Sequence, residues 1–337
     1  MEHGKHVAVE VPAAVSVEEC WQLVNTAERT RRHCMMLENC VYDFFELTTL
    51  NMAQQGLFGE IIHTEGAYIH NLDPFWNEYQ DNWRYEYNKQ HRGDVYPTHG
   101  MGPACWALDI HRGDRMKTLI AMDTDAFNGK KLAQKHGEES YLNGDHTTTL
   151  MRTANGKVVE IQHNVMTPQP YNRLFKLTGT KGYATKYPTP EYALSGEVLQ
   201  GTGAPKVDNL SAHGFMNAEQ KKALEKKYYH PILAKYVEKG RDLGHGGMDF
   251  VMDSRLVYCL QNGLPLDMDV YDMAEWCCLA ELGALSMDNN CAAVSFPDFT
   301  RGHWNEVKGY KHAFAPAAEE AAAEAKAEAY TKTQKEA

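Results

Sequence analysis

Several features that would assign a function class are missing from this sequence. It has no apolar run near the roughly 20 residues that a membrane-spanning helix needs, and its opening residues, MEHGK, lack the apolar core of a signal peptide. Lysine and arginine nowhere cluster densely enough to follow a phosphate backbone, and the formal net charge is -11. We therefore expect no membrane span and no nucleic-acid partner.

The sequence also lacks the common cysteine and glycine signatures. Its eight cysteines form no CxxC pair, so we expect them to be reduced packing residues. A GxGxxG turn, which cradles the phosphates of a dinucleotide, is absent. No metal site is predicted, because His245 and Asp249 in GHGGMDF supply only two candidate ligands.

What is present is typical of an ordinary globular protein of about two domains. The 337 residues are 43% hydrophobic and 23% charged. The first 59 residues predict two strand-helix units, with strands at 6–11 and 33–39 and a capping box formed by Ser16 and Glu19. Such units indicate part of a parallel α/β sheet.

From residue 60 the pattern changes to that of a largely antiparallel sheet covered by helices. Residues 60–70 alternate as a half-exposed strand, with Ile62, Thr64, Gly66, Tyr68 and His70 on one face. Asn155-Gly156 predicts a hairpin with a type I′ turn. We further expect an aromatic loop at 75–93, a helix with Pro97 in its first turn, a strand at 173–178, and helices at 217–239, 248–261 and 269–286. This domain would span 60–310, before an Ala/Glu/Lys-rich solvated tail at 311–337.

Polar side chains interrupt the packing pattern in four places. Glu10-Val11 and Glu38-Asn39 follow the two predicted parallel strands, and ligands bind at such carboxyl ends. Tyr96 and His99 would share one face at a helix start. Glycines beside His245 would let a backbone approach a ligand closely.

Seven motifs together resemble glycoside hydrolase family 109, whose members are NAD-dependent α-N-acetylgalactosaminidases of the Gfo/Idh/MocA superfamily. The motifs occur in order as HCMMLENC, EGAYIH, DVYPTHG, PQPYNR, HGGMDF, NGLPLDMDVYDMAEW and PDFTRG. The resemblance implies a Rossmann domain followed by an α/β domain with an open sheet. It also implies that residues 1–59 are the C-terminal remnant of the Rossmann domain. About three preceding βα units, with the glycine turn, would then be absent, and NAD binding by this chain would be weak.

The same resemblance implies roles for individual residues. Glu10, Val11 and Asn39 would lie against NAD, and His99 and Tyr171 would be the catalytic proton-transfer groups. The residues expected around the sugar are Tyr68, Arg84, Tyr96, Pro97, Thr98, His99, Tyr171 and, from the glycine-rich match, His245.

One departure from the wider superfamily bears on the reaction. Sugar dehydrogenases of that superfamily carry Glu-Lys-Pro at the first strand end, with the lysine as proton shuttle, whereas this sequence has Glu10-Val11-Pro12. Since valine cannot transfer a proton, net alcohol oxidation is disfavoured. The glycosidase branch is favoured, with a redox-elimination route that retains the anomeric configuration.

Two alternatives remain open from the sequence. One is an NAD-dependent sugar oxidoreductase, or a glycosidase for another α-linked sugar. The other is a non-catalytic remnant that binds sugar or forms a homo-oligomer, because an unpaired sheet edge recruits another chain. The partner would be a glycan or small molecule with terminal α-N-acetylgalactosamine. We expect location in the bacterial envelope or periplasm if a longer form supplies an export signal.

Overall fold

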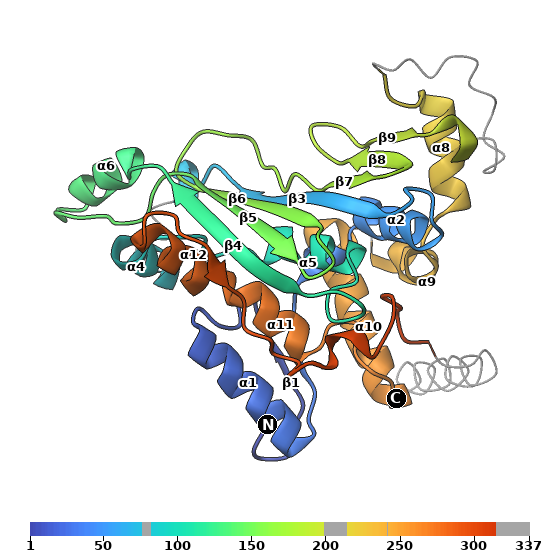
Figure 1. The fold of residues 1–337 in the computed structure, drawn as a ribbon, viewed down its shortest axis with the longest axis horizontal. Helices are drawn as coiled ribbons and strands as arrows, with labels where there is room; N and C mark the ends of the chain where they lie inside the picture. The colour runs from blue at the N-terminus through green and yellow to red at the C-terminus, as the bar shows by residue number, and fades with distance from the viewer. Residues whose placement is uncertain (76–81, 199–213, 241, 315–337) are drawn as a thin grey trace, which may run out of the picture.

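The structure, a computed structural model, describes residues 1–75, 82–198, 214–240 and 242–314. It contains two sheets, with the smaller one beside α1 at the bottom of Figure 1 and the larger one crossing the upper half. The elements in chain order are β1 (Val7–Val9), α1 (Val17–Thr30), β2 (Cys34–Met36), η1 (Asn39–Tyr42), α2 (Phe44–Gln54), β3 (Ile61–Ile69), η2 (Asp73–Phe75), α4 (Trp83–Gln90), α5 (Thr98–Ala107), β4 (Met116–Asp123), α6 (Phe127–Lys135), β5 (Thr147–Thr153), β6 (Val158–Asn164), β7 (Lys176–Gly179), β8 (Gly182–Thr185), β9 (Glu191–Leu194), α8 (Ala218–Lys227), α9 (Pro231–Gly240), η3 (Gly244–Gly247), α10 (Met248–Asn262), α11 (Val270–Cys277), α12 (Leu279–Asp288), β10 (Val294–Ser295) and η4 (His303–Asn305).

The smaller sheet is the predicted parallel pair. β1 and β2 run parallel with Val7 opposite Cys34, and α1 connects them. The Ser16 side chain accepts from the backbone N–H of Glu19, as a helix N-cap does. The Glu19 carboxylate, however, accepts from the backbone N–H of Val15 at 2.9 Å, one residue earlier than a capping box requires.

The larger sheet has eight strands in the order β10-β4-β5-β6-β3-β7-β8-β9. Only β3 and β6 pair in parallel within it, so the prediction of a largely antiparallel sheet is confirmed. α5 packs on β3 and α12 packs on β4, and both helices lie on the same side of the sheet in Figure 1. Apolar side chains of β4 and β5, among them Met122 and Leu150, are exposed, so this part of the sheet is left uncovered on one face.

Several local predictions are wrong. Residues 75–93 are not all loop, because they contain the helix α4. Asn82 caps this helix, and its residues Tyr85 and Asn88, one turn apart, are buried. Ile62 is exposed rather than in line with Thr64, because the pairing shifts register between Ile61 and His63. The predicted helix at 217–239 is two helices, since the proline at 231 cannot continue the backbone hydrogen bonding of α8.

The hairpin of β5 and β6 is confirmed, but its turn is not type I′. That turn requires positive φ at both central residues, and of the pair only Gly156 has it, at 86°. Tertiary contacts hold Asn155 instead: its backbone N–H donates to Asp114 and its side chain donates to the backbone carbonyl of Gly113.

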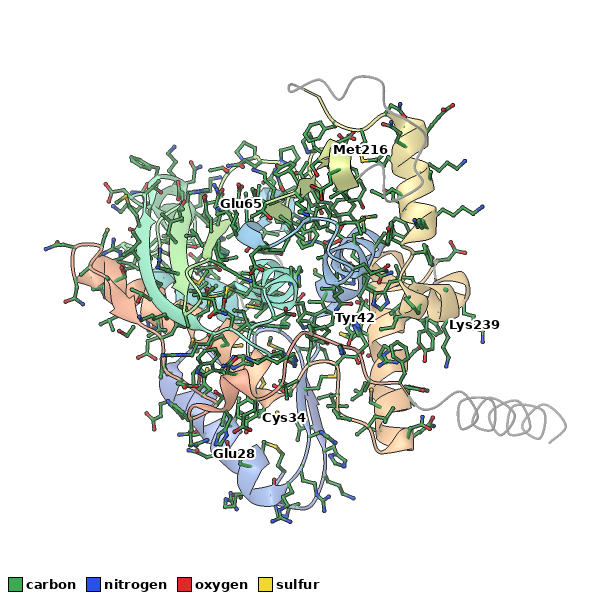
Figure 2. All side chains as sticks on the ribbon, turned by 45° about the vertical axis from the view of Figure 1, so that its right-hand side comes forward. Glu28, Cys34, Tyr42, Glu65, Met216 and Lys239 are labelled. Carbon is green, nitrogen blue, oxygen red and sulfur yellow. The ribbon has the colours of Figure 1, made fainter. Side chains whose placement is uncertain are left out.

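One apolar core joins the two sheets. It includes side chains on both sides of residue 59, with Trp276 of α11 completely buried in it, and α11 packs against both α1 and β2. Figure 2 shows Tyr42 inside the molecule and Glu28 at its surface. All eight cysteines are free, and seven are buried, as predicted.

Across the part of the chain that the structure describes, no helix combines the length and hydropathy needed to cross a bilayer. The predicted start of the solvated tail at 311 is wrong, because His312 is buried and packs against the ring of Trp106. Residues 315–337 of the predicted tail lie outside the described residues.

Candidate active site

The candidate site lies where the first two strands end. β1 and β2 pair in parallel, so Glu10-Val11 and Glu38-Asn39 follow them at the same edge. The helix α5 packs on β3 of the larger sheet and contacts η1, which follows β2. Its first turn carries His99 to this edge.

Two glycines allow α5 to approach its sheet closely. An added Cβ on Gly66 of β3 would lie 2.5 Å from the backbone oxygen of Gly100, and one on Gly100 would lie 2.7 Å from the backbone nitrogen of Ala67. This backbone contact sets the position of His99 beside Tyr68.

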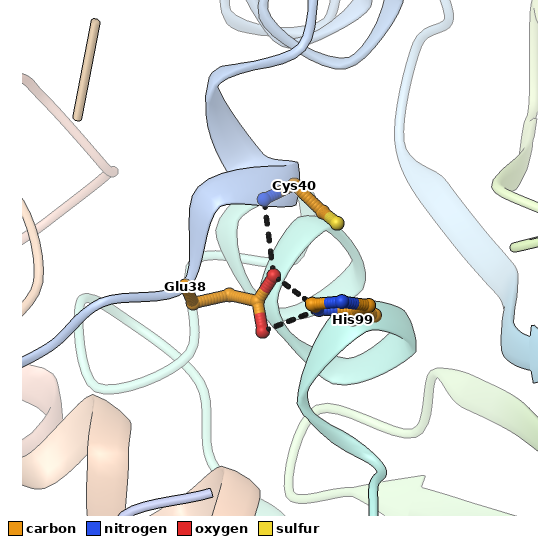
Figure 3. A group of neighbouring side chains, drawn as sticks. All are labelled: Glu38, Cys40 and His99. Carbon is orange, nitrogen blue, oxygen red and sulfur yellow. Dashed lines mark hydrogen bonds and ion pairs between the residues drawn. The ribbon is translucent and has the colours of Figure 1, made fainter. Parts of the chain in front are cut away.

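Glu38 and His99 form the central pair of the site. The Nδ1 atom of His99 lies 2.7 and 2.9 Å from the two carboxylate oxygens of Glu38, and the backbone N–H of Cys40 donates to the same carboxylate at 3.0 Å (Figure 3). The Glu38 side chain is 0% exposed and that of His99 is 11% exposed. Glu38 was noted as a polar strand end, but its pairing with His99 was not predicted.

Electrostatics keep Glu38 ionised in this buried position. Burial by itself raises the pKa of Glu38, but the charge and hydrogen bonds of His99, with a further hydrogen bond from the backbone N–H of Cys40, outweigh burial and leave the pKa below its usual value. Because an ionised carboxylate can only accept, Nδ1 of His99 carries the proton of this hydrogen bond.

Tyr68 is the centre of an aromatic cluster around His99. Its ring lies 4.7 Å from the ring of Tyr96, 5.4 Å from that of His99 and 6.3 Å from that of Tyr171, measured between centroids. Its hydroxyl is 3.2 Å from Nδ1 of His70. Four of the predicted residues therefore lie in one cluster, although they come from β3, the start of α5 and the segment before β7.

Arg84 joins this cluster from a helix. It was predicted to be a loop arginine, but it is the second residue of α4. Its guanidinium carbon lies 4.2 Å from the ring centroid of Tyr96, a cation-π contact that places a permanent positive charge beside the tyrosines.

Pro97 and Thr98 lie in the turn that leads into α5, and both are buried. The Thr98 side chain is 0% exposed. These two residues therefore shape the backbone that carries His99.

Tyr171 is the exposed member of the cluster, with 40% of its surface accessible. Beneath it, Arg173 donates to Asp43 at 2.8 Å, to Glu46 at 2.9 Å and to the sulfur of Cys40 at 2.9 Å. Lys186 lies 2.7 Å from both carboxylates. The two cations and two anions form a compensated, largely buried network that supports the Tyr171 side of the site.

Asn39 connects the strand end to His245. Its amide donates to Asp249 at 2.6 Å, and the other oxygen of Asp249 lies 2.7 Å from Nδ1 of His245. The His245 side chain is 67% exposed, so it marks the rim. Gly246 was expected to permit close approach, but an added Cβ there would meet open space, and its φ of 68° is what requires glycine.

At the end of β1, Glu10 is exposed and Val11 is partly buried. Val11 packs against both of the molecule's apolar clusters, the large core and the smaller cluster that contains Tyr68 and Tyr96. It therefore presents an apolar surface between the two sheets.

The cavity at this site is small. A cavity lined by Tyr68, Arg84, Tyr96 and His163 holds about 10 Å³, roughly the space of one water molecule. A much larger cavity, about 820 Å³, lies around His111 and Arg301 and includes none of the predicted site residues.

Sequence reasoning missed Cys40, His70, His163 and Arg173 as neighbours of the site. Cys40 and Arg173 stood inside the motifs HCMMLENC and PQPYNR, but no local pattern indicates that they touch. The signal in the sequence that could have marked these two residues was their place in the two motifs, not their spacing.

The arrangement of the two sheets matches a known class of fold. A levoglucosan dehydrogenase solved with NADH and levoglucosan has a TM-score of 0.64 at 15% identity, over 88% of this chain and 74% of that chain. An inositol dehydrogenase homolog from Azotobacter vinelandii, complexed with NADH and myo-inositol, has a TM-score of 0.54 at 17% identity, over 88% and 73%. The chain thus has the Gfo/Idh/MocA-like oxidoreductase fold.

Sequence comparison specifies the family within that class. The family described as "Glycosyl hydrolase 109, C-terminal domain" matches residues 42–306. Glycosyl hydrolase family 109 protein 3 of Phocaeicola vulgatus is 68% identical over 349 residues, which cover 100% of this chain and 64% of the relative. Family 109 protein 1 of Bacteroides thetaiotaomicron is 62% identical over 94% of this chain and 68% of the relative. The chain belongs to glycosyl hydrolase family 109, as the motifs indicated, and spans just under two thirds of the length of the first of these relatives.

Proposed function

We propose that this protein is an NAD-dependent glycosidase that releases terminal α-linked N-acetylgalactosamine with retention of configuration. The observation that carries the proposal is the buried Glu38–His99 pair, held below Tyr68 and beside the carboxyl ends of β1 and β2. Membership of family 109 and the NADH-bound structures with the same fold support it.

The residues at the two strand ends fit the nicotinamide end of NAD. Val11 offers an apolar surface between the two clusters, and Glu10 and Asn39 supply polar groups at the same edge, so these three residues would hold the cofactor. NAD held there would supply reversible hydride transfer at C3 of the sugar, which would make the proton on C2 acidic.

His99 is the base in this proposal. Its Nδ1 is held by Glu38, and Nε2, on the opposite side of the ring, takes the proton from C2 and later returns it. The buried carboxylate stabilises the imidazolium formed in between, because the opposite charge is 2.7 Å away.

Tyr171 is the second proton-transfer group. Its hydroxyl gives a proton to the aglycone oxygen as the bond to C1 breaks, and it recovers a proton from the water that adds at C1. Arg84, Tyr68 and Tyr96 would hold the sugar hydroxyls and the acetamido group, since the arginine keeps its charge at every working pH.

The test is to incubate the chain with NAD and an aryl α-N-acetylgalactosaminide in deuterium oxide. We expect free N-acetylgalactosamine with deuterium at C2 and no net NADH. His99→Ala should abolish both signals, whereas His303→Ala, at an exposed histidine of η4, should leave them unchanged.

Other products would assign other functions. An oxidised sugar formed with equimolar NADH would identify a sugar oxidoreductase. Sugar binding without turnover and without NAD binding in calorimetry would identify a binding module, because the phosphate turn is not in this sequence.

A further inference from the structure

Glu38, Cys40 and His99 together present three kinds of metal ligand. A carboxylate oxygen of Glu38, Sγ of Cys40 and a ring nitrogen of His99 all lie within 4.8 Å of one another. Glu38 and Cys40 are 0% and 1% exposed. In Figure 3 the carboxylate and the imidazole meet below the Cys40 backbone, with the sulfur on the same side of η1.

We propose that these three side chains form a binding site for Zn²⁺ that competes with the Glu38–His99 hydrogen bond. The oxygen, sulfur and nitrogen set suits zinc, whereas Mg²⁺ and Ca²⁺ prefer oxygen ligands alone. Three protein ligands also leave a fourth position, which a water molecule or a sugar hydroxyl would take.

The three ligand atoms need only small movements to reach zinc geometry. Atoms that coordinate one tetrahedral zinc ion at about 2.0–2.3 Å lie about 3.3–3.6 Å apart. The distance from His99 Nδ1 to Glu38, now 2.7 Å, would open slightly, and the sulfur would close from at most 4.8 Å.

The surrounding charges balance when zinc is bound. The Glu38 carboxylate and the Cys40 thiolate neutralise the two positive charges of the ion. Arg173 touches the sulfur at 2.9 Å, but its charge and that of Lys186 are already compensated by Asp43 and Glu46. The zinc-bound group would therefore carry no net charge, whereas the free site carries the charge of the Glu38 carboxylate.

Binding moves two protons and changes no oxidation state. Cys40 releases its thiol proton to solvent as the sulfur-zinc bond forms. The ring proton of His99 moves from Nδ1 to Nε2, which leaves Nδ1 able to bind the ion. Nε2 then donates rather than accepts. On the basis of the proposed function, zinc would inhibit turnover, whereas the binding itself does not depend on that function.

The experiment is a Co²⁺ titration of the metal-free full chain, because cobalt replaces zinc and its thiolate complexes absorb in the near ultraviolet. We expect one equivalent of Co²⁺ to produce a thiolate-to-cobalt band, and added Zn²⁺ to bleach it. Cys40→Ser should remove the band and weaken Zn²⁺ binding by about tenfold or more. His99→Asn should weaken binding to a similar extent.

The matched control is Cys291→Ser, at the one cysteine that is not buried, and it should keep the band. The proposal would be overturned if the wild-type chain gave no band or if the band persisted in Cys40→Ser. Loss of the band in Cys291→Ser but not in Cys40→Ser would also overturn it. Circular dichroism of each variant separates ligand loss from unfolding. If Zn²⁺ binds at Cys40 but turnover is unaffected, the site stands and the role of His99 as base falls.

Discussion

Replacing Gly66 by alanine should separate β3 from α5 and disturb the candidate site without touching any of its side chains. The new Cβ would lie 2.5 Å from the backbone oxygen of Gly100 and 2.7 Å from its Cα. Because both obstacles are backbone atoms next to His99, no side-chain rotation relieves the clash. The strand must move away from the helix by about 0.5–1 Å.

The expected cost follows from two opposing effects. Overpacking of an interior costs about 1–3 kcal/mol, and the rigid obstacle puts this site at the upper end. Alanine in place of a strand glycine returns about 0.5–1 kcal/mol through the unfolded state. We expect a net loss of about 2 kcal/mol in the free energy of unfolding, measured by urea denaturation.

The same displacement should lower turnover, because a misplacement of about 1 Å between reacting groups costs on the order of 100-fold. Gly283→Ala in α12 is the control: its Cβ would meet only the Cβ of Ala121, at 3.8 Å, and alanine should stabilise the helix by up to about 1 kcal/mol. A Gly66→Ala protein as stable as the wild type would refute the claim that this backbone contact positions the site.

Two further substitutions test buried charges near and away from the site. Burial raises the pKa of Asp94 to about 8 from its ordinary 3.8, so the folded state holds a proton that the unfolded chain releases. Between about pH 5 and pH 8 this group should make stability fall by about 1.4 kcal/mol per pH unit. Asp94→Asn should flatten that dependence in urea denaturation at several pH values, and an unchanged slope would contradict it. Asp267→Ala leaves Arg255, now paired at 2.7 Å and 1% exposed, without its partner in the interior, and we expect a loss of about 3–5 kcal/mol. Glu2→Gln, which breaks the exposed pair with Arg29, should leave stability nearly unchanged because solvent screens that pair; equal losses in the two variants would show that burial does not matter.

Local patterns predicted the elements whose causes are local. The N-cap at Ser16, the parallel strands at 33–39 and near Val7, and the hairpin around Gly156 all appear in the structure. Predictions failed where distant residues intervened. Asn155 is held by Asp114 and Gly113 rather than by the turn preference of its own dipeptide.

The candidate site shows the same division. The motifs were sufficient to indicate the family, the strand-end residues and a set of aromatic and basic candidates, and the structure gathers Tyr68, Tyr96, His99 and Tyr171 into one cluster. No sequence pattern indicated that Arg84 stacks on Tyr96 from a helix, or that Cys40 contacts Arg173.

The amino-acid sequence by itself therefore indicated the family, many of the strands and helices, and which residue types stand at the strand ends, because periodicity, capping and motif identity are properties of neighbouring residues. Only the tertiary structure decided that Glu38 holds His99, 61 positions away in the chain. That pairing depends on how closely α5 and β3 pack at Gly66 and Gly100, a distance that steric contact sets and that no local spacing encodes.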